Sequence, residues 1–161
     1  AWPFRKPLVE FTPKANLRHP GSYSPIAAFT SGGFKEVYDD ATVSDVSTVK
    51  KVLMCSGKIF FDLDEKRKKE NRTDIAIVRI EQLYPLPQTQ LDELYKKYGK
   101  AIWYWVQEEP FNMGAATYMR TNLKNINFYI ISRQASAATA TGHAKMHAQE
   151  QAQILEAAIL K

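Results

Sequence analysis

Between residues 51 and 160, short apolar runs alternate with longer amphipathic segments. The runs are rich in β-branched and aromatic residues, which predicts strands rather than helices. Four strands are expected over residues 51–56, 74–80, 101–106 and 127–132. Helices are expected over residues 58–71, 88–98, 113–123 and 143–160, where apolar residues recur at helical spacing. Strands that alternate with helices of this length predict a mostly parallel sheet covered by helices on both faces.

Two adjacent carboxylates, Glu108 and Glu109, follow the aromatic run of residues 101–106. Open α/β sheets place ligand and interface groups at the carboxyl ends of their strands, so this position favours a functional role. Neighbouring residues on an extended strand point to opposite faces, and the two carboxylates therefore cannot form an acid–base pair by themselves. The alternative is that they only cap and solvate the turn.

The residues after the two carboxylates predict a turn that leads into a helix. Pro110 is expected to set up the turn, and Asn112 to cap the helix that follows. Gly114 is expected to allow a close approach of the backbone, because glycine carries no Cβ.

The first 45 residues are less regular than the rest of the chain. A short strand is expected over residues 5–12, and an edge strand over residues 34–39. Residues 13–20 lie between prolines and carry Lys14, Arg18 and His19, which indicates either an anion or partner contact or a solvated linker. The pair Asp39-Asp40 lacks further oxygen ligands at regular spacing, so a site for a hard cation is not predicted.

Composition predicts a folded domain without an obvious nucleic-acid surface. The chain has 161 residues, 45% of them hydrophobic, which is enough for one domain with a core. The net charge of +5 is modest, and aromatic residues are not interleaved with basic ones as in a stacking platform. The basic run Lys66-Arg-Lys-Lys69 ends a predicted helix, where the helix dipole favours cations, and is interpreted as a solvated terminus.

The single cysteine, Cys55, excludes an internal disulfide and any cysteine-based zinc site. It lies in an apolar run and is expected to be a buried, inert thiol. No apolar run approaches the roughly 20 residues that a membrane-spanning helix needs, so no membrane contact is expected. The first residues do not resemble a signal peptide, and a cytoplasmic protein is the expectation.

A complete active site is not evident in the sequence, so no catalytic, cofactor-binding or metal-ligating residue is assigned. His143 and His147 have a spacing that can start a zinc site, but no glutamate lies between them and no third ligand is apparent. Ser56 and Ser136 have no identifiable histidine and acid partners. Ser56-Gly57-Lys58 could hold an anion on the amides of the next helix, although it lacks the further glycines of a P-loop.

Five segments, in this order, resemble the carboxy-terminal part of the thiamine-diphosphate-dependent dehydrogenase component of 2-oxoglutarate dehydrogenase complexes. The resemblance covers nearly the whole chain, and the family's usual prolines in the last segment are replaced here by Gln134 and Ala138. The segments are Arg5-Lys-Pro-Leu-Val9 with Thr12-Pro-Lys14 and Leu17-Arg-His-Pro20; Lys51-Val-Leu-Met-Cys-Ser-Gly-Lys58; Ala76-Ile-Val-Arg-Ile-Glu-Gln-Leu-Tyr-Pro85; Gln107-Glu-Glu-Pro-Phe-Asn-Met-Gly-Ala115; and Arg133-Gln-Ala-Ser-Ala137 with Thr141-Gly142.

Wider relatives of that family are transketolases and pyruvate dehydrogenase β-subunits. The resemblance therefore implies a three-layer α/β/α sandwich, with a five-stranded, mostly parallel mixed sheet, like the carboxy-terminal domain of transketolase. It assigns that domain to residues 46–161, a linker to residues 21–45, and the end of a preceding pyrimidine-binding domain to residues 1–20.

The family's activity, as the resemblance implies it, is oxidative decarboxylation of 2-oxoglutarate and succinyl transfer to lipoamide. Thiamine diphosphate and magnesium would be held by earlier domains of the full-length homodimer, so this fragment is expected to hold no cofactor and to be inactive alone. Its implied roles are dimerisation, support of the active-site domains, and docking or regulation beside the dihydrolipoyl succinyltransferase core.

Candidate sites follow from that resemblance. The candidate interface residues are Glu108, Glu109 and Asn112, and the candidate allosteric anion-binding residues, for acetyl-CoA or a nucleotide, are Lys14, Arg18 and Arg133. A second hypothesis is a stand-alone small-anion or nucleotide-binding α/β module that uses residues 56–58 and Arg133. An independent transketolase-like enzyme is disfavoured, because the chain is too short to house the cofactor.

Overall fold

The computed structural model describes residues 5–7, 9 and 12–161, and the chain divides into two compact units at Gly33. The smaller unit contains two 3-10 helices and one short helix: η1 (Lys14–Arg18), η2 (Pro20–Ser22) and α1 (Ala27–Thr30). The strand expected over residues 5–12 falls partly on residues 8, 10 and 11, which lie outside the described residues, so it stays a prediction.

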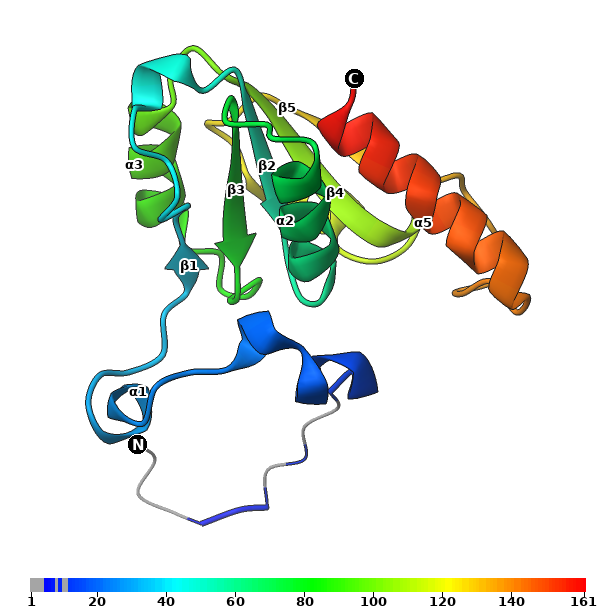
Figure 1. The fold of residues 1–161 in the computed structure, drawn as a ribbon, viewed down its shortest axis with the longest axis horizontal. Helices are drawn as coiled ribbons and strands as arrows, with labels where there is room; N and C mark the ends of the chain where they lie inside the picture. The colour runs from blue at the N-terminus through cyan, green and yellow to red at the C-terminus, as the bar shows by residue number, and fades with distance from the viewer. Residues whose placement is uncertain (1–4, 8, 10–11) are drawn as a thin grey trace. The chain divides into compact units, whose positions relative to one another are not determined.

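The larger unit, residues 34–161, alternates strands and helices as the apolar periodicity predicts. Figure 1 shows the strands between two sets of helices. In chain order the elements are β1 (Val37–Tyr38), η3 (Val46–Thr48), β2 (Lys51–Cys55), α2 (Ile59–Lys69), β3 (Ile75–Ile80), α3 (Gln88–Lys97), β4 (Ile102–Pro110), α4 (Ala116–Asn122), β5 (Phe128–Arg133) and α5 (Ala144–Ile159).

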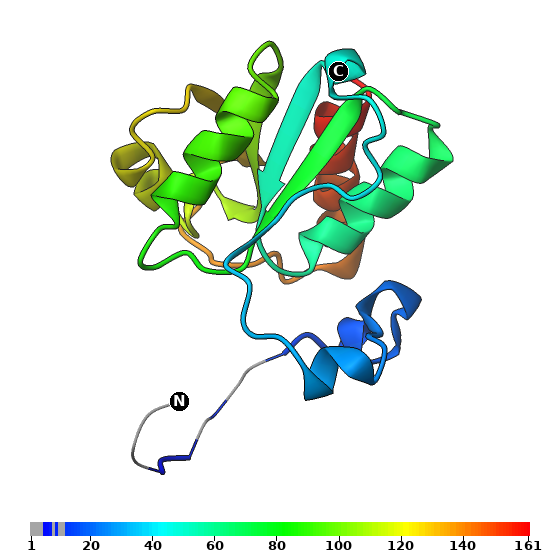
Figure 2. The ribbon, with the colours of Figure 1, turned by 90° about the vertical axis from the view of Figure 1, so that its left-hand side faces the viewer.

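The five strands form one mixed sheet in the order β1-β3-β2-β4-β5. Strands β2 to β5 pair in parallel, and only the edge strand β1 pairs antiparallel, with β3. Helices α3 and α4 cover one face, and α2 and α5 cover the other (Figure 2). The predicted fold class, a three-layer α/β/α sandwich with a five-stranded mixed sheet, is confirmed, as is the edge strand expected within residues 34–39.

The core has two halves that share the central strand β2, whose five residues are all buried. Val52 and Met54 point to the face covered by α3 and α4, together with Trp103 and Trp105 of β4. Leu53 and Cys55 point to the face covered by α2 and α5. Burying an aliphatic side chain of this size contributes about 1.5–3 kcal/mol to the free energy of unfolding, so the two halves hold most of the stability.

Residues just before the predicted domain start at 46 are tied to the sheet by a buried carboxylate. Asp40 accepts a hydrogen bond from the backbone N–H of Ile77 at 2.8 Å. It also forms an ion pair with Arg67 of α2. Arg67 also donates to the carbonyl oxygen of Ile75 at 3.1 Å. The expectation that the whole basic end of this helix is solvated was wrong for Arg67, whose side chain is only 7% exposed.

The pKa of Asp40 is held below the usual value for an aspartate. Burial by itself would raise this pKa, but hydrogen bonds from Thr42 and from the Ile77 N–H, and the charge of Arg67, outweigh it. Asp40 is therefore ionised at neutral pH and replaces, with its side chain, the strand pairing that ends at Tyr38.

Helix α5 packs only through its second half. Ile154, Ala158 and Ile159 are buried against the sheet, whereas Ala144 and Ala148 are exposed. Its last carbonyl groups are bound by cations: Lys51 donates to Ala158 at 2.9 Å, and Arg72 donates to Ile159. Cations at a helix carboxyl terminus complement the helix dipole.

No helix among the described residues is both long and apolar enough to cross a lipid bilayer.

We predict that Arg67→Met lowers the free energy of unfolding by about 3 kcal/mol, because it leaves the buried Asp40 carboxylate without its cation. Urea unfolding measured by circular dichroism tests this. Lys68→Met is the matched control, since Lys68 pairs with the same Asp64 as Arg67 but its side chain is 66% exposed. Equal losses for the two variants would contradict the assignment.

We also predict a definite pH dependence for Asp40. A carboxylate whose pKa is depressed in the folded state stabilises fully above its unfolded pKa of about 3.9 and loses this effect as pH falls. The difference in unfolding free energy between wild type and Asp40→Asn should therefore be constant from pH 7 to about pH 5 and shrink below about pH 4. A difference that grows on acidification would show that the pKa is raised instead.

Candidate functional site

The carboxyl ends of β2 and β4 lie side by side at the point where the chain changes direction across the sheet. β2 leads through α2 to β3 on one side, whereas β4 leads through α4 to β5 on the other. In open α/β sheets such a switch point is where ligands bind. The residues after β2 and at the end of β4 are therefore the first candidates for function.

An ion pair between Lys58 and Glu108 occupies this switch point. Lys58 directly precedes α2, and its Nζ contacts Oε1 of Glu108, with both side chains partly buried. The segment Ser56-Gly57-Lys58 was predicted as an alternative anion site. Its lysine is already neutralised by a carboxylate of the protein itself.

A β-bulge shapes the end of β4. Between the pairs Val106 with Ile131 and Pro110 with Arg133, β4 contains more residues than β5, so its register shifts. Gln107 follows the strand alternation of Trp103 and Trp105, so its side chain lies on the face covered by α4, where it is 3% exposed. Glu108 is partly buried and Glu109 is exposed, which agrees with the prediction that they do not converge.

The Gln107 side chain forms hydrogen bonds to both ends of the turn between β4 and α4. This role was not predicted from the sequence. Its Oε1 accepts a hydrogen bond from the N–H of Ala116, the first residue of α4, at 2.8 Å. The same oxygen accepts from Trp105 Nε1 at 2.9 Å. Its Nε2 donates to the carbonyl oxygens of Pro110 at 3.0 Å and Met113 at 2.8 Å. The sequence feature that could have indicated this role is an amide side chain between the apolar strand and the turn from Pro110 to Gly114.

Asn112 does not cap the helix that follows it, so that prediction was wrong. Its Nδ2 donates to the Ser136 carbonyl at 3.0 Å, and its Oδ1 accepts from the Ser136 N–H at 3.0 Å. The side chain thus joins the turn after β4 to the loop after β5. The first N–H of α4, that of Ala116, donates to Gln107 Oε1 instead. The interface role suggested for Asn112 stays a prediction.

Gly114 adopts the conformation that its predicted role requires. Its φ angle is +63°, and an added Cβ would lie 3.0 Å from the Cβ of Glu109. The turn therefore folds back onto the strand that it leaves. Pro110 closes the same turn, because its carbonyl oxygen accepts from the Met113 N–H at 2.8 Å.

Arg133, at the end of β5, lies in a cluster with Thr141, His147 and Glu150, here called the Arg133 cluster. Its guanidinium donates to Thr141 Oγ1 at 3.1 Å, lies 2.9 Å from His147 Nδ1, and is 3.4 Å from Glu150 Oε2. Thr141 also donates to Glu150. The Arg133 side chain is 9% exposed and faces the Glu150 carboxylate, while its Nε is buried without a hydrogen-bond partner among the described residues.

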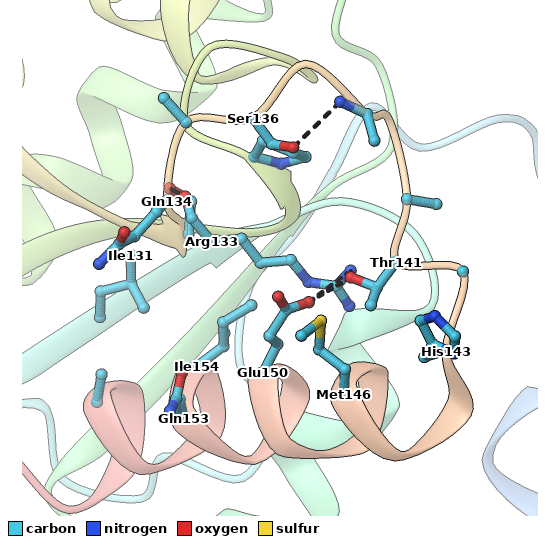
Figure 3. A pocket seen from close by; sticks show the side chains of 17 residues that line it. Ile131, Arg133, Gln134, Ser136, Thr141, His143, Met146, Glu150, Gln153 and Ile154 are labelled. Carbon is cyan, nitrogen blue, oxygen red and sulfur yellow. Dashed lines mark hydrogen bonds and ion pairs between the residues drawn. The ribbon is translucent and has the colours of Figure 1, made fainter.

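The Arg133 cluster borders a pocket of about 660 Å³ between β5, residues 134–142 and α5. Figure 3 shows Arg133, Thr141 and Glu150 directed toward one another across it. The lining is mixed, with Ile131, Ile154 and Met146 beside polar groups such as Gln134 and His143. Lys14 and Arg18 lie on η1 of the smaller unit, so a site shared by them and Arg133 stays a prediction.

Within the part of the chain that the structure describes, no three His, Cys, Asp or Glu side chains are grouped so that they could hold a metal ion. His147 Nδ1 is engaged with Arg133. Burial raises the pKa of the Cys55 thiol to about 12, so this cysteine is the inert core residue that was predicted.

Comparisons with known proteins agree on one family. A sequence model described as 2-oxoglutarate dehydrogenase C-terminal matches residues 23–159. The chain is 42% identical to the 2-oxoglutarate dehydrogenase E1 component of Azotobacter vinelandii, over 96% of this chain and 17% of that protein. It is 37% identical to the corresponding component of Haemophilus influenzae, with 96% and 17% covered.

A relative with a different description is similar too. The chain is 40% identical to a multifunctional 2-oxoglutarate metabolism enzyme of a Mycobacterium species, over 96% of this chain and 13% of that protein. The chain therefore spans only a small part of the length of the relatives it matches.

We predict that Gly114→Ala destabilises the protein more than Gly57→Ala. Both glycines have positive φ angles, +63° and +74°, so both substitutions should cost about 1 kcal/mol through the backbone. Only at Gly114 does the new Cβ meet other atoms, while nothing lies within 4 Å at Gly57. Thermal unfolding of both variants tests this, and equal losses would show that the turn relaxes away from Glu109.

Proposed function

The chain belongs to the 2-oxoglutarate dehydrogenase C-terminal family, and we propose that it serves as the carboxy-terminal structural and regulatory domain of a thiamine-dependent 2-oxoglutarate dehydrogenase. The observation that carries the proposal is the similarity over 96% of this chain to 17% of a much longer E1 component. The full-length protein would decarboxylate 2-oxoglutarate and transfer the succinyl group to lipoamide, as an oxidoreductase of the tricarboxylic acid cycle.

Thiamine diphosphate and magnesium would belong to other parts of that protein. Among the described residues no three His, Cys, Asp or Glu side chains come together, and no residue of this chain is assigned to the metal or to the cofactor. The chemistry would be carried out by the remainder of the polypeptide. The domain would support that remainder.

The carboxyl edge of the sheet supports a role as a contact surface between domains or subunits. The Lys58–Glu108 ion pair and the hydrogen bonds of Gln107 fill the position where a ligand would enter. The Glu109 side chain is exposed beside them and forms no ion pair with any described residue. An exposed carboxylate without an ion-pair partner in this chain could pair with a cation of a neighbouring domain or subunit.

The assembly that this role implies is a homodimer bound to a dihydrolipoyl succinyltransferase core, in the cytoplasm. An acetyl-CoA or nucleotide effector could act through Lys14, Arg18 and Arg133. The alternative, a stand-alone anion-binding module, is less well supported. It depends on the segment 56–58, whose Lys58 already pairs with Glu108 of this chain.

Immunodepletion tests the proposed function directly. Antibodies raised against residues 34–161 should remove 2-oxoglutarate dehydrogenase activity from a lysate of the source cells. Pyruvate dehydrogenase activity in the same lysate should remain and is the internal control. Undiminished 2-oxoglutarate activity after complete removal of the antigen would refute the proposal.

We predict that Glu109→Ala weakens dimerisation of the full-length enzyme at least about tenfold, while changing the unfolding free energy of this chain by less than about 0.5 kcal/mol. Analytical ultracentrifugation measures the first quantity and urea unfolding the second. Glu93→Ala, which removes another exposed carboxylate on α3, is the control for net charge. Equal effects of both variants on assembly would exclude a specific role for Glu109.

A further inference from the structure

The Arg133 cluster fastens a loop that has few other attachments. Residues 134–142 are small or uncharged and mostly exposed. Side-chain hydrogen bonds from other elements reach this loop at two places, at Ser136 from Asn112 and at Thr141 from the Arg133 cluster. The second attachment joins the loop to β5 and to the exposed first half of α5.

The contact between Arg133 and His147 fixes the state of the imidazole. A guanidinium has only donors and keeps its charge at any physiological pH. At 2.9 Å from Arg133 Nη2, His147 Nδ1 must therefore accept, and the imidazole proton lies on Nε2. A second proton on Nδ1 would remove this hydrogen bond and bring two cations into contact.

Few neighbouring side chains could balance the positive charge of a protonated His147. Arg133 faces His147 from β5, and the 134–142 loop contains no titratable side chain. On α5 itself the charged or titratable neighbours are His143, Lys145 and Glu150, and Glu150 already pairs with Arg133. From α2, Asp62 binds Gln151 further along the helix.

We propose that the Arg133 cluster is a proton-sensitive fastening that holds the 134–142 loop across the pocket when His147 is neutral and releases it when His147 is protonated. Histidine is the side chain that proteins use most widely as a pH switch, because an imidazole can take up a second proton. The proposal is independent of the proposed enzymatic role.

Nitrogen NMR of the histidine rings tests the first half of the proposal on the 161-residue chain. At pH 7.5 the His147 signals should show an unprotonated Nδ1 and a protonated Nε2. A ring with its proton on Nδ1 would overturn the proposal, since that nitrogen could not accept from Arg133.

Hydrogen–deuterium exchange tests the second half. Protection of residues 134–142, corrected for the intrinsic pH dependence of exchange, should fall about tenfold between pH 7.5 and 5.5 in wild type, because a hydrogen bond to a charged group is lost. Protection that stays constant in wild type would overturn the proposal.

Three variants locate the effect. His147→Gln keeps an acceptor but cannot titrate, so its protection should not depend on pH, whereas His143→Gln, which changes the other histidine of this region, should behave like wild type. Thr141→Val should lower protection already at pH 7.5, because it detaches the loop from Arg133 and Glu150. His147 is exposed, so its replacement should not unfold the chain. A pH response that persists in His147→Gln would assign the effect to another group.

Discussion

The architecture depends on covering both faces of the central strand β2. A parallel strand in the middle of a sheet cannot leave either face in water, so its residues must be apolar throughout and helices must lie on both sides. Here Val52 and Met54 require α3 and α4, while Leu53 and Cys55 require α2 and α5. Helix α5 follows the edge strand β5 and returns toward the centre of the sheet, where its second half supplies part of this cover.

Polar groups complete the structure where the apolar core ends. At one end of the sheet, Gln107 satisfies the backbone groups of the turn after β4 and the first N–H of α4. On the side of the antiparallel edge, Asp40 satisfies the Ile77 N–H and holds Arg67. Each of these two side chains bonds to backbone groups that have no partner in a helix or in the sheet. Removing one would leave several buried backbone groups without partners, which costs far more than one surface hydrogen bond.

The strands and helices were predictable because their apolar periodicity is local. An edge strand near Val37 was also expected, although that region is less regular, and motif order indicated the family. The roles of Arg67, Gln107 and Asn112 were not predictable, because each depends on a partner that the fold brings close from a distant part of the chain. Asn112 illustrates this: its spacing suits a helix cap, yet its hydrogen bonds go to Ser136. The candidate interface and anion residues remain predictions, since they depend on molecules outside this chain.

Helix α5 is attached to the rest of the domain in two different ways. Lys51 and Arg72 bind its last carbonyl groups, and Ile154, Ala158 and Ile159 pack its second half onto the sheet. Its first half, about 12 Å long at 1.5 Å per residue, contacts β5 through polar side chains, since His147 and Glu150 both meet Arg133. A rotation of α5 about its buried end would therefore change the Arg133 cluster before it changed the core.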